Sequence, residues 1–188
     1  LVTAMDTVKI TVLNVNRKPV FERVSTQSVS EGNTLTVNLR ATDADGAIPI
    51  LQMSTQLTNA TFVDSGNGVG TLRFNPYYNQ GNDNPTTYYV SFSAIDSEYP
   101  SDTGYYQPPL MILVYDVPMP PNILPVNDTS VVEGDTLSFW VFASDPDGTT
   151  PTLSAFNLPA NAYFSLIGGG VGVFRFYPSF IQAGVYTV

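Results

Sequence analysis

The fold is decided by one stretch, Ser30-Glu-Gly-Asn-Thr-Leu-Thr-Val-Asn-Leu-Arg-Ala-Thr-Asp-Ala-Asp-Gly46, which returns as Val132-Glu-Gly-Asp-Thr-Leu-Ser-Phe-Trp-Val-Phe-Ala-Ser-Asp-Pro-Asp-Gly148. Corresponding residues keep one constant offset, and the register between the two copies runs without a gap from about residue 17 to residue 80. Self-similarity of this kind is typical of tandem modules. The chain is therefore predicted to contain two copies of one structural unit.

Within this stretch, apolar and polar residues alternate. Leu35, Val37, Leu39 and Ala41 fall on one side, which is typical of a half-buried β-strand. The Glu-Gly-Asn before the strand and the Asp-Ala-Asp-Gly after it favour turns. The same alternation continues in later segments, where it predicts short strands over 51–54, 153–156 and 88–96. It also predicts inward positions for Leu72, Phe74, Phe174 and Phe176 and outward positions for Arg73 and Arg175.

These patterns predict an all-β fold made of tandem immunoglobulin-like β-sandwiches in a linear array. Residues 17–117 would form a complete module and residues 118–188 a module that lacks its last strands. Residues 1–16 would be the last strands of a preceding module, or a donor strand that completes the second module of a neighbouring copy. Linkers are expected at 16–19 and 117–121, where prolines recur at the repeat offset.

The amino-acid composition argues against several classes of function. The 188 residues contain no cysteine and no histidine, so the usual general base and the commonest zinc ligands are absent, and we expect no catalytic site. The net charge is −9, which argues against nucleic acid as a partner and favours a cation. No apolar run reaches the ~20 residues of a membrane span. Few lysines and many Thr, Ser, Asn and Gly residues favour an extracellular, cell-surface location.

The two ends of the sequence fit together. Tyr186-Thr-Val188 followed by Leu1-Val-Thr-Ala-Met-Asp6 matches Tyr88-Tyr-Val-Ser-Phe-Ser-Ala-Ile-Asp96 without a gap. We therefore expect residues 1–15 to lie in the second module of another copy, with Leu1 beside Val188 and with Val2, Ala4, Val8, Ile10 and Val12 facing inward. The array would be either one long chain or a filament of separate subunits. A simple truncation with a chance match is the alternative.

Two features could bind a glycan or a protein ligand. Residues 97–109 form an extra loop in the first module, and its Tyr105 and Tyr106 suit sugar or protein contact, although a packed hairpin is the alternative. Trp140 and Phe142 fall on the polar side of their strand. Aromatic residues placed there would anchor a neighbouring module or form a binding platform.

With these motifs, the chain resembles the cadherin-like and bacterial immunoglobulin-like tandem repeats of surface proteins. The resemblance covers nearly the whole chain and rests on Glu31 and Glu133, Asp43-Ala-Asp45 and Asp145-Pro-Asp147, Asp96 and Asp6, and the linkers Asn14-Val-Asn-Arg-Lys-Pro19 and Asp116-Val-Pro118. In that family, such residues meet where consecutive modules join and bind calcium, which stiffens the rod.

The resemblance implies two calcium sites. One would gather Glu31, Asp116, Asp145 and Asp147, with Asp6 of the next copy. The other would gather Asn14, Asn16, Asp43, Asp45 and Asp96, with Glu133 of the previous copy. Carboxylate and amide oxygens are the ligands that calcium takes. Arg17 and Lys18 stand where the family's linker carries Asp and Asn, and its Asp-Arg-Glu motif has no match near Asn75. These two cations could instead replace the metal by pairing with the same carboxylates.

The leading hypothesis is a non-enzymatic structural repeat module of an extracellular fibre, filament or adhesin stalk, which polymerises or continues end to end. The alternatives are a glycan- or protein-binding adhesive module and an accessory repeat of a large secreted enzyme.

Overall fold

The structure is a computed structural model that describes residues 4–188. These residues form strands and no helix, so the all-β prediction is confirmed, and none of them lies in a helix able to cross a membrane. The chain divides into two compact units. Unit 1 comprises the chain up to Val29 with Asn33–Pro76 and Thr86–Val114, and unit 2 comprises Ser30–Gly32, Tyr77–Pro85 and Tyr115–Val188. The module boundaries expected from the sequence remain a prediction.

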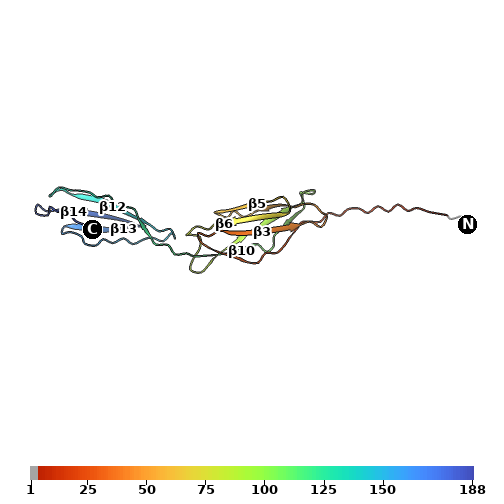
Figure 1. The fold of residues 1–188 in the computed structure, drawn as a ribbon, viewed down its shortest axis with the longest axis horizontal. Coiled ribbons are helices and arrows are strands. Elements are labelled where there is room, and N and C mark those ends of the chain that lie inside the picture. Colours follow the sequence, from red (N-terminus) through yellow and green to blue (C-terminus); the bar gives the residue numbers. More distant parts are fainter. Residues whose placement is uncertain (1–3) are drawn as a thin grey trace. The chain divides into compact units, whose positions relative to one another are not determined.

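One sheet of unit 1 is built around the strand predicted from the alternation of residues 35–41. Its order is β1 (Val20–Phe21), β3 (Leu35–Thr42), β6 (Val69–Phe74) and β5 (Ala60–Asp64), all antiparallel (Figure 1). In β3 every second residue faces inward, as the alternation predicts. Leu72 and Phe74 are buried and Arg73 is exposed, which confirms the predicted faces of β6.

The facing layer consists of two three-stranded sheets joined by a long hairpin. One has the order β2 (Gln27–Ser30), β10 (Leu110–Tyr115), β7 (Thr86–Val90), and the other β4 (Ile50–Met53), β8 (Phe92–Ile95), β9 (Thr103–Tyr105). The single strand expected over 88–96 is therefore wrong, because it is divided at Ser91. The Ser91 N–H donates to Thr55 Oγ1 and its carbonyl accepts from Ser54 N, each at 2.9 Å.

Buried side chains of the two layers meet in one core, which includes Leu39 and Phe74 from one layer and Val90, Phe92 and Ile112 from the other. The first layer has the strand order β1-β3-β6-β5. The facing layer is built on the hairpin formed by β7–β8 and β9–β10, and β4 pairs with β8 of this hairpin. This is the strand arrangement of an immunoglobulin-like sandwich.

Unit 2 repeats the first of these sheets. Its order is β11 (Asn122–Ile123), β12 (Leu137–Ser144), β14 (Val171–Phe176) and β13 (Ala162–Gly168) (Figure 1). Phe174 and Phe176 are buried and Arg175 is exposed, as predicted. Local details repeat too. Gly170 and its counterpart Gly68 both have positive φ, and both place their carbonyl where an alanine N–H of the central strand donates to it.

One predicted strand of unit 2 is absent. Residues 153–156 form no strand, whereas their counterpart β4 pairs with β8 over four residues. The physical reason is that a strand needs a partner for its backbone groups, and unit 2 has no equivalent of β8. The expectations for Leu1 and Val2 lie outside the described residues. Residues 4–15 carry no strand, and every one of their side chains is exposed.

Candidate functional site

The acidic turn of unit 1 holds the backbone of the preceding linker. Asp45 N donates to Asp43 Oδ1 at 2.7 Å, which closes the turn, and Asp45 Oδ2 accepts from Arg17 N at 2.6 Å. Asp43 Oδ2 is buried and has no hydrogen-bond partner. The turn therefore has one carboxylate oxygen left over for a further ligand.

The acidic turn of unit 2 has the same arrangement. Asp147 N donates to Asp145 Oδ1 at 2.9 Å, and Asp147 Oδ2 accepts from Met119 N at 2.8 Å. Asp145 Oδ2 accepts from the Thr149 hydroxyl at 2.8 Å, and Asp147 Oδ1 is buried without a partner. Met119 and Arg17 are corresponding residues of the two repeats. The turn and the linker therefore form one repeated structural feature.

Glu31 holds the other side of the linker that contains Met119. Its side chain is buried, Oε1 accepts from the backbone N–H of Gln80 (2.8 Å) and of Gly81, and Oε2 accepts from Val117 N at 3.1 Å. Its counterpart Glu133 accepts from Ala183 N at 2.5 Å, which matches the Gly81 bond. Both Glu31 oxygens bind backbone donors, so this residue positions the linker.

Asp116 lies among other carboxylates of unit 2. Burial raises the pKa of its carboxyl group above the ordinary value, and the negative charges of Glu31 and Asp147, a hydrogen bond with the Glu31 side chain and the charge of Asp83 raise it further. Three of the predicted calcium ligands, Glu31, Asp116 and Asp147, are thus brought together with Asp83. Asp83 is not among the predicted ligands, because its segment has no counterpart in register in the second repeat.

A second polar cluster in unit 1 is centred on Asn16. Its Nδ2 donates to Asp96 Oδ2 and to Asp102 Oδ2, each at 2.9 Å. Asp96 is fully buried, and its Oδ1 accepts from the N–H groups of Glu98 and Tyr99. The Asn16 hydrogen bond lowers the pKa of Asp96 most; desolvation opposes it, and the two backbone bonds add to it. Asp102 was missed because it lies in the extra loop.

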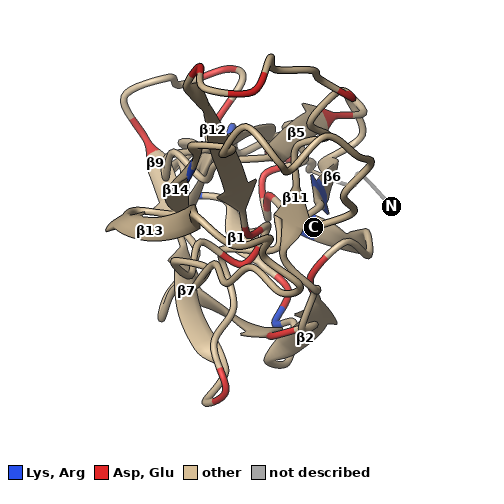
Figure 2. Ribbon diagram, turned by 90° about the vertical axis from the view of Figure 1, so that its left-hand side faces the viewer, with Lys and Arg blue, Asp and Glu red and all other residues tan. Residues whose placement is uncertain are grey.

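The remaining predicted ligands lie apart. Asp6 and Asn14 are exposed, and Asp6 Oδ1 accepts only from the adjacent Thr7 N among the hydrogen bonds of the described residues. Whether Asp6 or Glu133 reaches a neighbouring copy stays a prediction. Figure 2 shows that the Asp and Glu residues lie mainly in the turns and loops that connect the strands.

The oxygen-rich donor set fits calcium in part. The unpartnered buried oxygens of Asp43 and Asp147 are suitable hard donors. Within residues 4–188, however, no three carboxylates are arranged to hold a metal ion as they stand. The alternative that Arg17 and Lys18 replace the metal finds no support in this part of the chain. The ion pair among the described residues joins Arg40 to Glu22 at 3.4 Å. Arg17 binds Asp45 through its backbone N–H.

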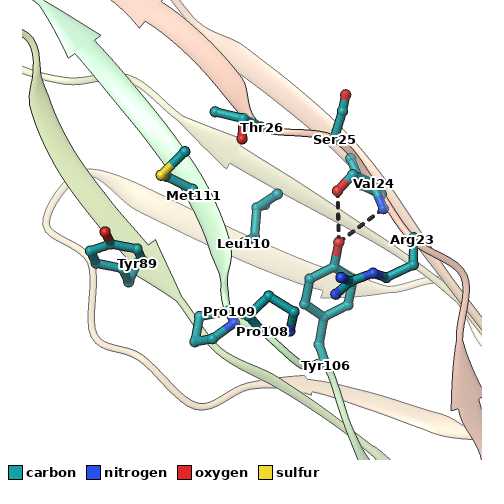
Figure 3. A pocket seen from close by; sticks show the side chains of 10 residues that line it. All are labelled: Arg23, Val24, Ser25, Thr26, Tyr89, Tyr106, Pro108, Pro109, Leu110 and Met111. Carbon is teal, nitrogen blue, oxygen red and sulfur yellow. Dashed lines mark hydrogen bonds between the residues drawn. The ribbon is translucent and has the colours of Figure 1, made fainter.

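The extra loop is a packed hairpin, and its Tyr106 is not a ligand-binding side chain. Tyr106 is 2% exposed; its hydroxyl donates to Val24 O at 3.0 Å and accepts from Val24 N at 2.9 Å (Figure 3). The expectation that Tyr106 contacts a ligand is therefore wrong. A hollow of about 470 Å³ lies beside it, lined by Tyr89, Met111 and neighbouring residues, whereas Tyr105 is exposed on β9.

The outer face of the unit 2 sheet is apolar where that of unit 1 is polar. Trp140 is 54% exposed and Phe142 is also exposed, which confirms the outward orientation predicted for both. At the corresponding positions of unit 1, Asn38 accepts a hydrogen bond from Thr71 at 3.0 Å, and Arg40 pairs with Glu22. The counterparts of Thr71 and Glu22 in unit 2 are Val173 and Leu124.

No protein-family model matches the chain, and no curated protein matches it. Among solved structures, the chain is similar to the sialic acid binding region of the Streptococcus sanguinis SK1 adhesin, with a TM-score of 0.46, 10% identity, and coverage of 87% of this chain and 69% of that one. It is similar to the endo-fucoidan hydrolase MfFcnA4 from glycoside hydrolase family 107, with a TM-score of 0.44, 12% identity and 89% of this chain covered. The chain spans 25% of that hydrolase's length. For the titin domains Z1Z2 in complex with telethonin, the TM-score is 0.39 at 16% identity, covering 88% of this chain and 84% of that one.

Proposed function

We propose that the chain is a non-enzymatic structural repeat module of an extracellular, cell-surface fibre, filament or adhesin stalk, and that it continues end to end with other copies of itself. The observation that supports this proposal is that carboxylates of unit 2 hold the backbone of the linker at two positions. Val117 N is held by Glu31 and, two residues later, Met119 N is held by Asp147.

These bonds restrict the linker at both of its ends. Hydrogen bonds from backbone N–H groups to carboxylates are stronger than neutral ones. The adjacent Pro118, Pro120 and Pro121 have a fixed φ and no N–H, which removes further freedom. A linker that is restricted in this way transmits force and orientation between modules, which is the property that a stalk needs.

Calcium would strengthen the same junction. Burial raises the pKa of Asp116, and the negative charges of Glu31, Asp147 and Asp83 raise it further. A bound calcium ion would neutralise this charge and take oxygen ligands from Asp116 and from the unpartnered oxygen of Asp147. The unpartnered oxygen of Asp43, which is the counterpart of Asp145, is the candidate ligand at the Asn16 junction.

The experiment compares motion of the linker at 117–121 in wild type, Glu31→Gln and, as the control, Glu98→Gln, whose exposed side chain belongs to unit 1. Spin labels on the two units report the distribution of distances between them. We expect a narrow distribution in wild type and in the control, and a broad one in Glu31→Gln. Chelation of calcium should broaden the wild-type distribution without unfolding either unit. A wild-type distribution as broad as that of Glu31→Gln would contradict a stiffening role.

A second candidate function is adhesive binding of a glycan or a protein, favoured by the exposed Trp140 and Phe142. Aromatic rings on a flat sheet suit stacking against sugar rings or apolar side chains. Unit 1 supplies the matched control, because Trp140→Asn converts the position to its counterpart Asn38. A glycan array should show binding that Trp140→Asn abolishes. The absence of binding by wild type would leave the structural role alone.

A further inference from the structure

The hollow of about 470 Å³ in unit 1 opens beside the outer face of the sheet formed by β2, β10 and β7. Tyr89 of β7 and Met111 of β10 form one of its walls (Figure 3). These two residues pair in the β7–β10 register, and the adjacent pair, Val90 and Leu110, is buried in the core. Because successive side chains of a strand point to opposite faces, Tyr89 and Met111 face outward, and Tyr89 is 62% exposed. The volume lies in the range of about 300–1,000 Å³ that is typical of small-molecule sites.

Both sides of the hollow are held in place by contacts within unit 1. On one side, the Tyr106 hydroxyl bonds the carbonyl and the N–H of Val24. On the other side, Pro108–Pro109 has a fixed φ at both residues. Arg23 joins the two sides, because its Nη1 donates to the Gln107 carbonyl. The walls are therefore positioned before a ligand arrives, which lowers the entropic cost of binding.

The hollow carries one positive charge and no negative charge. Arg23 is the one charged residue among the described residues that line it. Within residues 4–188 the ion pair joins Arg40 to Glu22, so no carboxylate neutralises Arg23, although the chain has 16 acidic and 7 basic residues. A guanidinium group has five N–H donors in a planar fork, and the bond to Gln107 uses Nη1 alone. The remaining donors can bind a carboxylate through charge-assisted hydrogen bonds.

The other lining groups suit a sugar ring. The exposed Tyr89 side chain offers a flat apolar surface with a hydroxyl group at its edge. Ser25 and Thr26, which are both exposed, supply two further hydroxyl groups to the lining (Figure 3). A sugar combines apolar C–H faces with hydroxyl groups that donate and accept hydrogen bonds, so it can use the aromatic ring and the hydroxyl groups together. A sugar with a carboxylate would also match Arg23.

A peptide strand fits this place less well. Peptides that extend a sheet use the unpaired backbone groups of an edge strand. The hollow lies beside Leu110 and Met111 of β10, and β10 is the central strand of its sheet, between β2 and β7. Recognition here therefore depends on side chains, which favours a compact ligand over an extended peptide.

We infer that this hollow binds a sugar that carries a carboxylate. Arg23 binds the carboxylate, and the Tyr89 ring lies against a C–H face of the sugar. Ser25 and Thr26 bind its hydroxyl groups. The inference goes beyond the proposed structural role, since every residue of the hollow belongs to unit 1 and none belongs to the linker at 117–121.

Titration of the full chain with acidic and neutral sugars, followed by the NMR shifts of its backbone amides, tests the inference. The probes are glucuronate and galacturonate, with glucose and galactose as their uncharged counterparts. We expect the acidic sugars to shift the amides of Ser25, Thr26 and Met111 to saturation. The neutral sugars should bind about 10-fold to 100-fold more weakly, because they lose the charge-assisted hydrogen bonds. Added salt should weaken the acidic sugars alone.

Two variants with matched controls assign the roles of the side chains. Arg23→Gln should lower the affinity for the acidic sugars to that of the neutral ones, whereas Arg73→Gln, which changes an exposed arginine of β6, should not. Tyr89→Ser should weaken acidic and neutral sugars alike. Its control is Tyr105→Ser, because the Tyr105 ring is 65% exposed and lies outside the residues that line the hollow. Both tyrosines are exposed, so neither substitution should unfold unit 1.

Three results would overturn the inference. They are the absence of shifts at the amides of the hollow with both acidic sugars, equal affinity for acidic and neutral sugars, and wild-type affinity in Arg23→Gln. Acetate or an acidic peptide that bound as tightly as the acidic sugars would also overturn it, because the sugar ring would then contribute nothing. None of these results changes the linker stiffness measured with Glu31→Gln, so the proposed function is tested separately.

Discussion

Replacement of Tyr106 by phenylalanine should destabilise unit 1 through the loss of a single oxygen atom. The hydroxyl bonds both backbone groups of Val24, donating to the carbonyl at 3.0 Å and accepting from the N–H at 2.9 Å. The ring would remain in place, so its edge contacts with Phe21 and Phe92 would be kept. The substitution therefore isolates the polar contribution.

The magnitude follows from what is left unpaired. A partly buried backbone group that loses its hydrogen-bond partner costs about 1–3 kcal/mol. Two such groups on Val24 predict a loss of about 2–6 kcal/mol in the free energy of unfolding, with the smaller values expected where water reaches one of them. For a domain of this size, that is a large fraction of the total stability.

Urea unfolding followed by circular dichroism measures the change. Tyr105→Phe is the matched control, because the neighbouring Tyr105 is 65% exposed and its hydroxyl lies outside the core. We expect the control to stay within about 0.5 kcal/mol of wild type. If Tyr106→Phe were equally close to wild type, the reasoning that Tyr106 anchors the segment before β2 would be refuted.

Three further predictions concern charge and packing. Because burial and neighbouring carboxylates raise the pKa of Asp116, its ionised form disfavours folding above the ordinary aspartate pKa of about 3.9, so Asp116→Asn should raise the melting temperature at pH 7. This gain should disappear in acid, and in calcium if the site is real; a lower melting temperature without calcium would contradict the cluster. The pKa of Asp96 is lowered, so its contribution to stability is present above about pH 3.9 and is lost as the pH falls through the lower folded value. Asn16→Ala should therefore lower neutral-pH stability and flatten the acid side of a melting-temperature profile, and an unchanged profile would count against the Asn16 bond. Finally, a methyl group at Gly70 would collide with the Phe62 ring, so Gly70→Ala should cost about 1–3 kcal/mol in urea unfolding, and a neutral effect would show that the ring moves freely.

Much of the candidate site could be predicted from the sequence, because the repeat marked corresponding residues. The constant offset paired Asp45 with Asp147, and the structure shows both bonded to a linker N–H. Asp83 and Asp102 could not be found this way. Both lie in segments without a counterpart in register, and only folding brings them close to Asp116 and Asn16.

By itself, the sequence determined the strands of the central sheets and the faces of their side chains. The reason is that alternation along a strand is a local property, set by a few neighbouring residues, as in Leu35–Thr42. Where the pairing partner of a segment lies far along the chain, only the tertiary structure decided whether that segment forms a strand. It divided 88–96 at Ser91, left 153–156 unpaired and turned Tyr106 into the core, because backbone pairing and burial depend on residues far along the chain.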